Sequence, residues 1–377
     1  MLGGDFYLNW PLFTRQGGKL ELYKAISRLY PDTIVVGSPS QDSDVVLNAL
    51  RHLYKFYTQE SGETVCFINK LDLRGTEVNK IMCEFISHKL IVKDLRFSQM
   101  KRNSGDFLKP KFTEKLTVTS SNYFSAHALN AEDFMSLIEL DLTECMRINF
   151  QTICEFLKTS KRIEKLKITD CWAYEENFFL CNFLETVYSK DCNLKSFTFN
   201  YSKGKIKHTT INFQPVLYSQ PNLIFLDFSF NIDLVHLIPK LVLNAPEVKE
   251  LVIKGLEIDD LNLAFNLHLE KLVVDDLFEL DKLLSTVFSP KFEYLVVESR
   301  LSFKHRQKIK NLLLFTLKSI IDRDGPFKAE FYKCWLNSIP DWLEDYKHKK
   351  KVTYEKIGGT FVVEKVKQLV LSKNLLK

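Results

Sequence analysis

Glycine and proline are scarce in this chain, with 13 glycines and 11 prolines among 377 residues. Such a composition argues against long disordered or linker segments, which are usually rich in these two residues. Hydrophobic residues make up 45% and charged residues 26% of the chain, and phenylalanine occurs 30 times. These fractions are typical of a packed soluble protein. We therefore expect almost the whole chain to fold around a sizeable core.

Signals for secretion and membrane insertion are also lacking. The first residues, Met1–Asp5, have neither the basic start nor the apolar run of about 7 to 15 residues that a secretory signal has. No stretch approaches the roughly 18 apolar residues of a membrane span. The eight cysteines form no CxxC pair and no zinc-like spacing, which favours a reducing compartment. We expect a cytoplasmic or nuclear protein with no contact to a membrane.

Motifs of the common enzyme classes are absent as well. The chain has no GxGxxG, GxxxxGK, HExxH or GxSxG sequence, and no two of its eight histidines stand at the spacing of metal ligands. We therefore expect a chain that is not an enzyme, with no cofactor, no metal and no small-molecule substrate.

What the chain does have is an internal repeat. An apolar residue, two residues of any kind, an apolar residue, one of any kind and a third apolar residue recur along it. Successive central residues are 21 to 31 positions apart, the extremes being Leu95 to Leu116 and Leu166 to Phe197. The ten central residues are Leu71, Leu95, Leu116, Leu140, Leu166, Phe197, Leu226, Leu251, Leu272 and Leu295.

The spacing within each unit predicts a short strand, because residues two apart point to the same side of a strand. Four of the intervening segments switch to helical spacing. They begin at Phe150, Phe179, Leu234 and Leu280. A strand, a turn and a helix close one coil, and neighbouring coils must stack because none can bury its apolar side alone.

This pattern resembles the leucine-rich-repeat superfamily in its longer-repeat form. That family has Asn or Cys three residues after the strand, where the side chain bonds the backbone of adjacent loops. Cys145, Cys171 and Asn231 occupy this place, and Thr76 and Ser202 are weaker substitutes. The remaining units depart from it, with Met100, Leu256, Leu277 and Arg300 there. The resemblance implies an α/β leucine-rich-repeat solenoid: a curved horseshoe with a parallel concave sheet and convex helices.

Three parts follow from this pattern. The repeats span residues 65–300. Residues 1–64 are predicted to form a helical N-terminal cap, with one helix over 20–29 and another over 45–57 that follows the capping residue Ser43. A recruiting module such as an F-box is the alternative for this end. Residues 301–377 predict an α+β C-terminal cap, with a helix over 303–321 and a hairpin around Gly358-Gly359. This last part is basic, with 17 Lys and Arg against 8 Asp and Glu.

The residues between the apolar strand positions are expected to line the concave face. Charges of both signs alternate in the first half, and the second half is more apolar. A nucleic-acid-binding surface would be lined mainly with basic residues, so a face with charges of both signs suits a protein partner better. The alternative is an ordinary solvated face without a binding role. The candidate partner-binding residues are Arg74, Arg96, Lys165, Lys167, Phe225, Asp227, Val252, Lys271, Tyr294 and Val296.

A basic patch near the C-terminus is the other candidate site. It consists of Lys347, Lys349, Lys350 and Lys351, and it is compatible with nucleic-acid binding, with nuclear import or with a plain solvated loop.

The chain as a whole is expected to be a non-catalytic protein–protein recognition subunit or scaffold within a multi-subunit complex. The family resemblance suggests a substrate receptor of a ubiquitin ligase complex. An adaptor in a ribonucleoprotein or chromatin-associated complex is the alternative.

Overall fold

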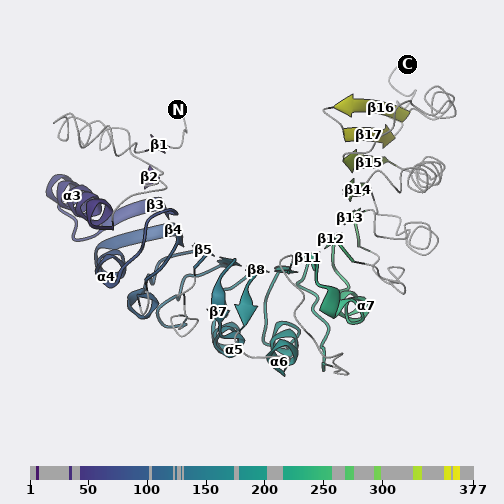
Figure 1. Cartoon of the computed structure of the whole chain (residues 1–377), viewed down its shortest axis with the longest axis horizontal. Coiled ribbons are helices and arrows are strands. Elements are labelled where there is room, and N and C mark those ends of the chain that lie inside the picture. Colours follow the sequence, from purple (N-terminus) through teal and green to yellow (C-terminus); the bar gives the residue numbers. More distant parts are fainter. Residues whose placement is uncertain are drawn as a thin grey trace, which may run out of the picture. The chain divides into compact units, whose positions relative to one another are not determined.

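The computed structural model describes residues 6–7, 34–35, 43–101, 104–121, 124, 129, 131–173, 178–201, 215–256, 268–275, 293–298, 326–332, 352–357 and 360–365. The chain divides into two compact units, Met1–Tyr218 and Ser219–Lys377, each considered by itself. Figure 1 labels most of their elements.

Unit 1 contains a sheet whose six described strands run parallel, in the order of the sequence, without closing into a barrel. Each of these strands is built on one of the first six predicted repeats, so these predictions are confirmed. Two short parallel pairs lie outside this sheet: β1 (Phe6–Tyr7) with β2 (Ile34–Val35), and β7 (Met146–Ile148) with β9 (Trp172–Ala173). The strands of the sheet are β3 (Cys66–Leu73), β4 (Leu90–Ser98), β5 (Lys115–Thr119), β6 (Glu139–Thr143), β8 (Lys165–Thr169) and β10 (Ser196–Asn200).

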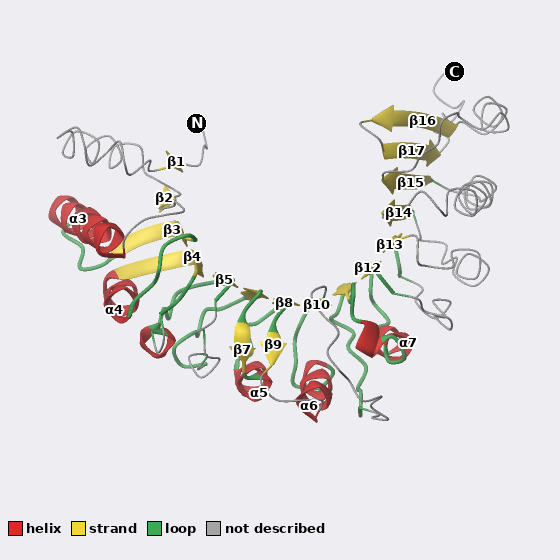
Figure 2. Cartoon of the chain, in the orientation of Figure 1, coloured by secondary structure: helices red, strands yellow, loops and turns green. Residues whose placement is uncertain are grey.

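The described helices of unit 1 are α3 (Ser43–Ser61), α4 (Lys80–Lys89), α5 (Phe150–Thr159) and α6 (Phe178–Val187), with the short 3-10 helix η1 (Gly105–Phe107). Figure 2 shows α4, α5 and α6 on the same side of the sheet. The helices predicted at Phe150 and Phe179 are thus confirmed, as is the one over 45–57. Asn149 caps α5, since its Oδ1 accepts a hydrogen bond from the Gln151 amide at 2.8 Å.

One detail of α3 differs from the prediction. Ser43, expected to cap the helix, is its first residue, and its hydroxyl donates instead to the carbonyl of Glu77. The hydroxyl therefore links α3 to the loop after β3 rather than capping its own helix.

Unit 2 repeats the arrangement with five parallel strands in its described part. They are β11 (Phe225–Asp227), β12 (Glu250–Ile253), β13 (Lys271–Asp275), β14 (Tyr294–Glu298) and β15 (Phe327–Tyr332). The first four confirm the last four predicted repeats, whereas β15 was not predicted. The predicted hairpin is also confirmed: β16 (Val352–Ile357) and β17 (Thr360–Lys365) are antiparallel, and β17 pairs with β15.

The helical spacing at Leu234 gives two short pieces instead of one helix. The 3-10 helix η3 covers Ile232–Leu234, and α7 covers Ile238–Leu243 with a proline in its first turn. Proline has no amide hydrogen to donate, so the first turn of a helix is the place where it fits. Pro239 therefore starts a new helix at Ile238.

The apolar positions of the repeat form the core between the sheet and the helices. Leu140 and Leu142 of β6 are fully buried, while their neighbours in the strand are partly exposed. Phenylalanines fill the space beneath α5 and α6: the rings of Phe150 and Phe183 lie 5.0 Å apart, and those of Phe183 and Phe197 5.9 Å apart. Some of the many phenylalanines thus pack between neighbouring coils.

A left-handed turn follows seven of the described strands at one constant position, four residues after the central apolar residue. The residues with positive φ there are Gly75, Gln99, Ser120, Glu144, Asp170, Phe230 and Gly255. At this position the backbone still bonds the next coil, as when the Ser120 amide donates to the Thr143 carbonyl at 2.8 Å. The turn therefore extends the hydrogen-bonded ladder beyond the strands.

The residue after this turn points inward. The thiol of Cys145 donates to the carbonyl of Val118 at 3.4 Å, and that of Cys171 to the carbonyl of Leu142 at 3.3 Å. Both bonds join one coil to the preceding one, which is the role expected for Cys at this place. A buried backbone carbonyl left without a donor would destabilise the coil.

Several predictions lie outside the described residues. These are the helices over 20–29, from 280 and over 303–321, and the basic run 347–351. In the described part of the chain, no helix is long and apolar enough to cross a membrane.

Candidate functional site

The surface of interest is the side of each unit's sheet turned away from the helices, which we call the open face. It consists of the residues that alternate with the buried strand positions. In β6, for example, Glu139, Asp141 and Thr143 are partly exposed. Because the strands pair in register, these residues form rows that cross the sheet.

On unit 1 the rows mix both charges with hydroxyl groups. One row reads Lys70, Asp94, Lys115, Glu139, Lys165 and Ser196, and the next reads Asp72, Arg96, Thr117, Asp141, Lys167 and Thr198. Neighbours of opposite sign therefore face each other across most of the strand pairs, which is the favourable arrangement for cross-strand charges.

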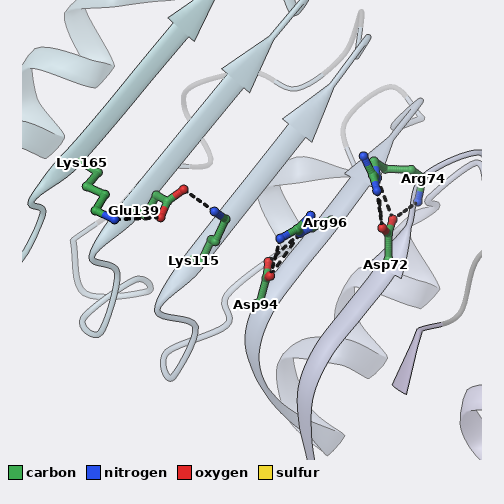
Figure 3. A network of polar contacts seen from close by, with 7 residues as sticks. All are labelled: Asp72, Arg74, Asp94, Arg96, Lys115, Glu139 and Lys165. Carbon is green, nitrogen blue, oxygen red and sulfur yellow. Dashed lines mark hydrogen bonds and ion pairs between the residues drawn. The ribbon is translucent and has the colours of Figure 1, made fainter. Parts of the chain in front are cut away.

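Two arginines of unit 1, Arg74 just after β3 and Arg96 within β4, are each held by an aspartate two residues earlier in the chain. The Nη2 of Arg74 lies 2.6 Å from Asp72 Oδ2, and that of Arg96 lies 2.7 Å from Asp94 Oδ2. In both pairs Nε bonds the same carboxylate, so the contact is bidentate (Figure 3). Hydrogen bonding to these carboxylates raises the pKa of both guanidinium groups.

The lysines of this face are paired in a similar way. Glu139 lies between Lys115 and Lys165 and forms an ion pair with each, as Figure 3 shows. Lys167 bonds Asp141 at 2.9 Å. The candidate residues Arg74, Arg96, Lys165 and Lys167 thus all have a carboxylate partner within the chain. The described face of unit 1 therefore presents paired charges of both signs, not a basic stripe.

On unit 2 two rows stand out. The valine row consists of Asp227, Val252, Val273, Val296 and Glu330. The aromatic row beside it consists of Phe225, Glu250, Lys271, Tyr294 and Lys328. The three valines form a cluster separate from the main core, and Phe225 and Tyr294 pack against it.

The valines are more buried than we predicted. Val252 and Val296 were expected as exposed binding residues, but they are only 7% and 6% exposed. The rings of Phe225 and Tyr294, which are partly exposed, shield them. The accessible apolar groups of this face are therefore the two rings, and the valines support them from below.

The charged residues around Tyr294 hold it in place. The ammonium groups of Lys271 and Lys328 lie 5.3 Å and 5.2 Å from the centre of its ring, within the range of cation–π attraction. Lys271 also bonds Glu250 at 2.6 Å, and Lys328 bonds Glu330 at 2.6 Å. Tyr294 is thus fixed between two lysines that are themselves held by carboxylates.

The candidate Asp227 has a local role as well. Its Oδ1 accepts hydrogen bonds from the amide and the hydroxyl of Ser229, at 3.0 and 2.6 Å.

Two residues of the face, Lys328 and Glu330, were missed because β15 lacks the repeat pattern. Its central buried position is the small Ala329. The alternation of Phe327, Ala329 and Phe331 with charged residues was the signal that could have revealed this strand.

The thiols form no reactive site in the described residues. Burial raises the pKa of Cys66 and Cys83 to about 12 and that of Cys192 to about 11. Cys181 is partly exposed, and desolvation and the nearby Glu185 raise its pKa to about 11. Among the described residues, no group of three or more His, Cys, Asp or Glu side chains could hold a metal ion.

Comparison of the chain with protein-family models and with curated proteins finds no match to either. The proposals that follow therefore depend on the repeat pattern and on the geometry of the open faces.

Proposed function

We propose that this chain is a diverged leucine-rich-repeat protein that acts as a non-catalytic recognition subunit and binds a protein partner. The binding surface is the open face of unit 2. The observation that carries the proposal is the pair of aromatic rings, Phe225 and Tyr294, packed on the valine cluster and surrounded by paired charges.

Aromatic side chains that are held rigidly dominate the binding energy of many protein interfaces. Less conformational entropy is lost when such groups are already fixed before the partner arrives. Phe225 is held by the valines, and Tyr294 by the valines and two lysines. A rim of charges around a small apolar centre is also the usual composition of a protein interface.

Nucleic acid fits the described surface less well. The affinity of a protein for nucleic acid comes largely from lysine and arginine side chains that neutralise backbone phosphates. The basic residues of unit 1 singled out above already have carboxylate partners in the chain, so a phosphate would have to displace them. An adaptor that uses Lys347, Lys349, Lys350 and Lys351 stays the second candidate, and these residues lie outside the described part.

The most concrete version of the first proposal is a substrate receptor of a ubiquitin ligase complex. It is supported by the resemblance of the repeats to those of such receptors. The compartment proposed for it is the cytoplasm or the nucleus, because the sequence has the cysteine pattern of a reducing environment.

A pull-down from cell lysate tests the proposal. The full chain is compared with the double variant Phe225→Glu/Tyr294→Glu, which places charges at both rings. The control is Ile224→Glu/Leu243→Glu, which changes two exposed apolar residues of unit 2 outside the open face. We expect the partners to be lost with the first variant and kept with the second.

The identity of the captured proteins separates the versions. Cullin adaptors among the lost partners support the substrate receptor. Nucleic acid that is recovered equally with both variants and released by moderate salt supports the second candidate. Protein partners unchanged by Phe225→Glu/Tyr294→Glu would refute the proposed surface.

A further inference from the structure

We infer that unit 1 has a second binding surface, which takes an acidic protein segment with bulky apolar side chains. The surface is the edge of the sheet at which the chain turns into the strands, and we call it the turn edge. It is separate from the open face of unit 2, so the inference does not depend on the proposed function. The residues of the turn edge are 63–69, 87–93, 108–114, 132–138, 158–164 and 189–195.

The same tight turn occurs in neighbouring coils of this edge. The Thr113 amide donates to the Pro110 carbonyl at 3.0 Å, and the Leu137 amide donates to the Phe134 carbonyl at 3.1 Å. A bond between the first and fourth residues of this kind closes a β-turn. Proline, glycine, asparagine, aspartate and serine are the usual central residues of such turns, because they favour its backbone angles or bond its backbone.

Two of these turns have large apolar side chains at their centres instead. Phe112 is 57% exposed and Met135 is 54% exposed. The corresponding turns of unit 2 have the ordinary centres Pro221-Asn222 and Pro246-Glu247. Neither the turn nor the core therefore requires Phe112 and Met135 to be apolar.

Two further apolar residues continue this patch along the turn edge. Phe67 on β3 is 53% exposed, and it pairs in register with the partly exposed Ile91 on β4. Phe67, Ile91 and Phe112 each stand four residues before the central residue of their repeat. The other seven repeats have a polar or charged residue at that position: Ser136, Arg162, Asn193, Asn222, Glu247, His268 and Lys291. Exposed apolar residues grouped in consecutive coils indicate an interaction site.

The charge of the turn edge differs between its two parts. In the first four coils, four lysines are balanced by four carboxylates: Lys89, Lys93, Lys109 and Lys111, with Glu63, Glu114, Glu132 and Asp133. In the next two coils, five basic residues outnumber two carboxylates: Lys158, Lys161, Arg162, Lys190 and Lys195, with Glu164 and Asp191. The turn edge is therefore neutral in the apolar part and basic beyond it.

Ion pairs within the chain leave some of the positive charge of the basic part uncompensated. Its two carboxylates already contact lysines, Lys195 at 2.8 Å and Lys161 at 3.9 Å. Lys158 and Arg162 are exposed, and neither has a carboxylate partner in the part of the chain that the structure describes. These two side chains are thus available to the carboxylates of a partner.

A protein segment suits this arrangement better than nucleic acid does. A nucleic-acid strand needs basic contacts along its whole length, whereas the apolar part of the turn edge has as many carboxylates as lysines. A protein can place apolar side chains on one part and carboxylates on the other. The turn edge crosses five strand intervals, or about 24 Å, which about 7 residues of extended chain cover.

A selection from random peptides of about 12 residues displayed on phage tests the inference, with the full chain as the target. We expect the enriched peptides to combine aromatic or aliphatic residues with Asp and Glu. An enriched peptide is then labelled and titrated by fluorescence anisotropy. Its binding should weaken as salt is added, because salt screens exposed ion pairs.

Variants of the chain locate the peptide. Phe112→Ser/Met135→Ser places ordinary turn residues at the two apolar turn centres, and Lys158→Glu/Arg162→Glu reverses the two available charges. Each variant should weaken binding of the peptide at least about tenfold. Circular dichroism checks that both variants are folded.

The controls are changes outside the turn edge. Ile81→Ser and Lys55→Glu replace exposed residues of α4 and α3, and they should leave binding unchanged. Phe225→Glu/Tyr294→Glu, on the open face of unit 2, should leave it unchanged as well. Binding lost only with this last variant would place the peptide on the open face and overturn the inference while the proposed function stands.

Three other outcomes would also overturn the inference. The first is that the enriched peptides lack carboxylates, and the second is that binding is unchanged in both turn-edge variants. The third is that no peptide is enriched, while a labelled oligothymidine strand or phosphatidylserine vesicles bind the chain and lose binding in these variants. That last result would assign the turn edge to nucleic acid or to a membrane surface.

Discussion

The left-handed turn after the strands makes two opposite stability predictions. Gly255 has φ of +71°, and a Cβ there would lie 2.2 Å from Cδ1 of the Phe230 ring. An L-residue in this conformation costs about 1 to 2 kcal/mol, and Phe230 would also have to move. Gly255→Ala should therefore lower the free energy of unfolding by more than about 2 kcal/mol.

Gln99 is the reverse case. It has φ of 55° and an exposed side chain. Gln99→Gly removes the strain of about 1 to 2 kcal/mol but adds about 0.5 to 1 kcal/mol of backbone entropy to the unfolded chain. The net result should be a stabilisation of about 0.5 to 1 kcal/mol.

Urea unfolding followed by far-ultraviolet circular dichroism measures both changes. The matched control is Lys93→Gly, which introduces glycine at another exposed position of the same repeat, inside β4. It should lower stability by about 0.5 to 1 kcal/mol. If Gln99→Gly lowers stability as much as Lys93→Gly does, the turn position carries no strain and the reasoning fails.

Two further predictions concern buried groups. The hydroxyl of Tyr188 is fully buried without a hydrogen-bond partner, so Tyr188→Phe should raise the free energy of unfolding by about 1 kcal/mol; a loss of stability in urea would show that the hydroxyl is satisfied. Burial raises the pKa of Cys66 and Cys83 to about 12, whereas an unfolded thiol titrates near about 8.5. The folded chain keeps these protons while the unfolded chain releases them, so stability should be level below about pH 8 and fall from there toward pH 12. The fall should be shallower in Cys66→Ala/Cys83→Ala, and an equal slope in the variant would contradict the assignment.

The strands could be predicted because their signal is local. Three apolar residues at fixed offsets define each strand and its buried side. This signal found the described parallel strands of the main sheet in each unit except β15, and it did not find the short pairs β1–β2 and β7–β9. In β15 the central position is Ala329, whose small side chain gives a weak apolar signal. The hairpin was found from Gly358-Gly359 between two alternating segments.

The open faces could be predicted only in part, because their properties depend on neighbours from other coils. The sequence places Val252 and Val296 on the face, but their burial depends on Phe225 and Tyr294 of different strands. The charge pairs depend on register: Glu139 contacts Lys115 and Lys165 because β5, β6 and β8 align at these residues. The spacing of residues along the chain does not reveal this register between the strands.

The constant position of the left-handed turn also bears on how this chain can vary. The offset from Leu116 to Ser120 and from Leu251 to Gly255 is the same, although the coils differ in length from 21 to 31 residues between central positions such as Leu95 to Leu116 and Leu166 to Phe197. Insertions and deletions are therefore absorbed on the side of the helices, where loops tolerate them. The open face can keep its geometry while the rest of each coil drifts in sequence and length, which is how a repeat protein can lose its likeness to relatives and still retain its binding surface.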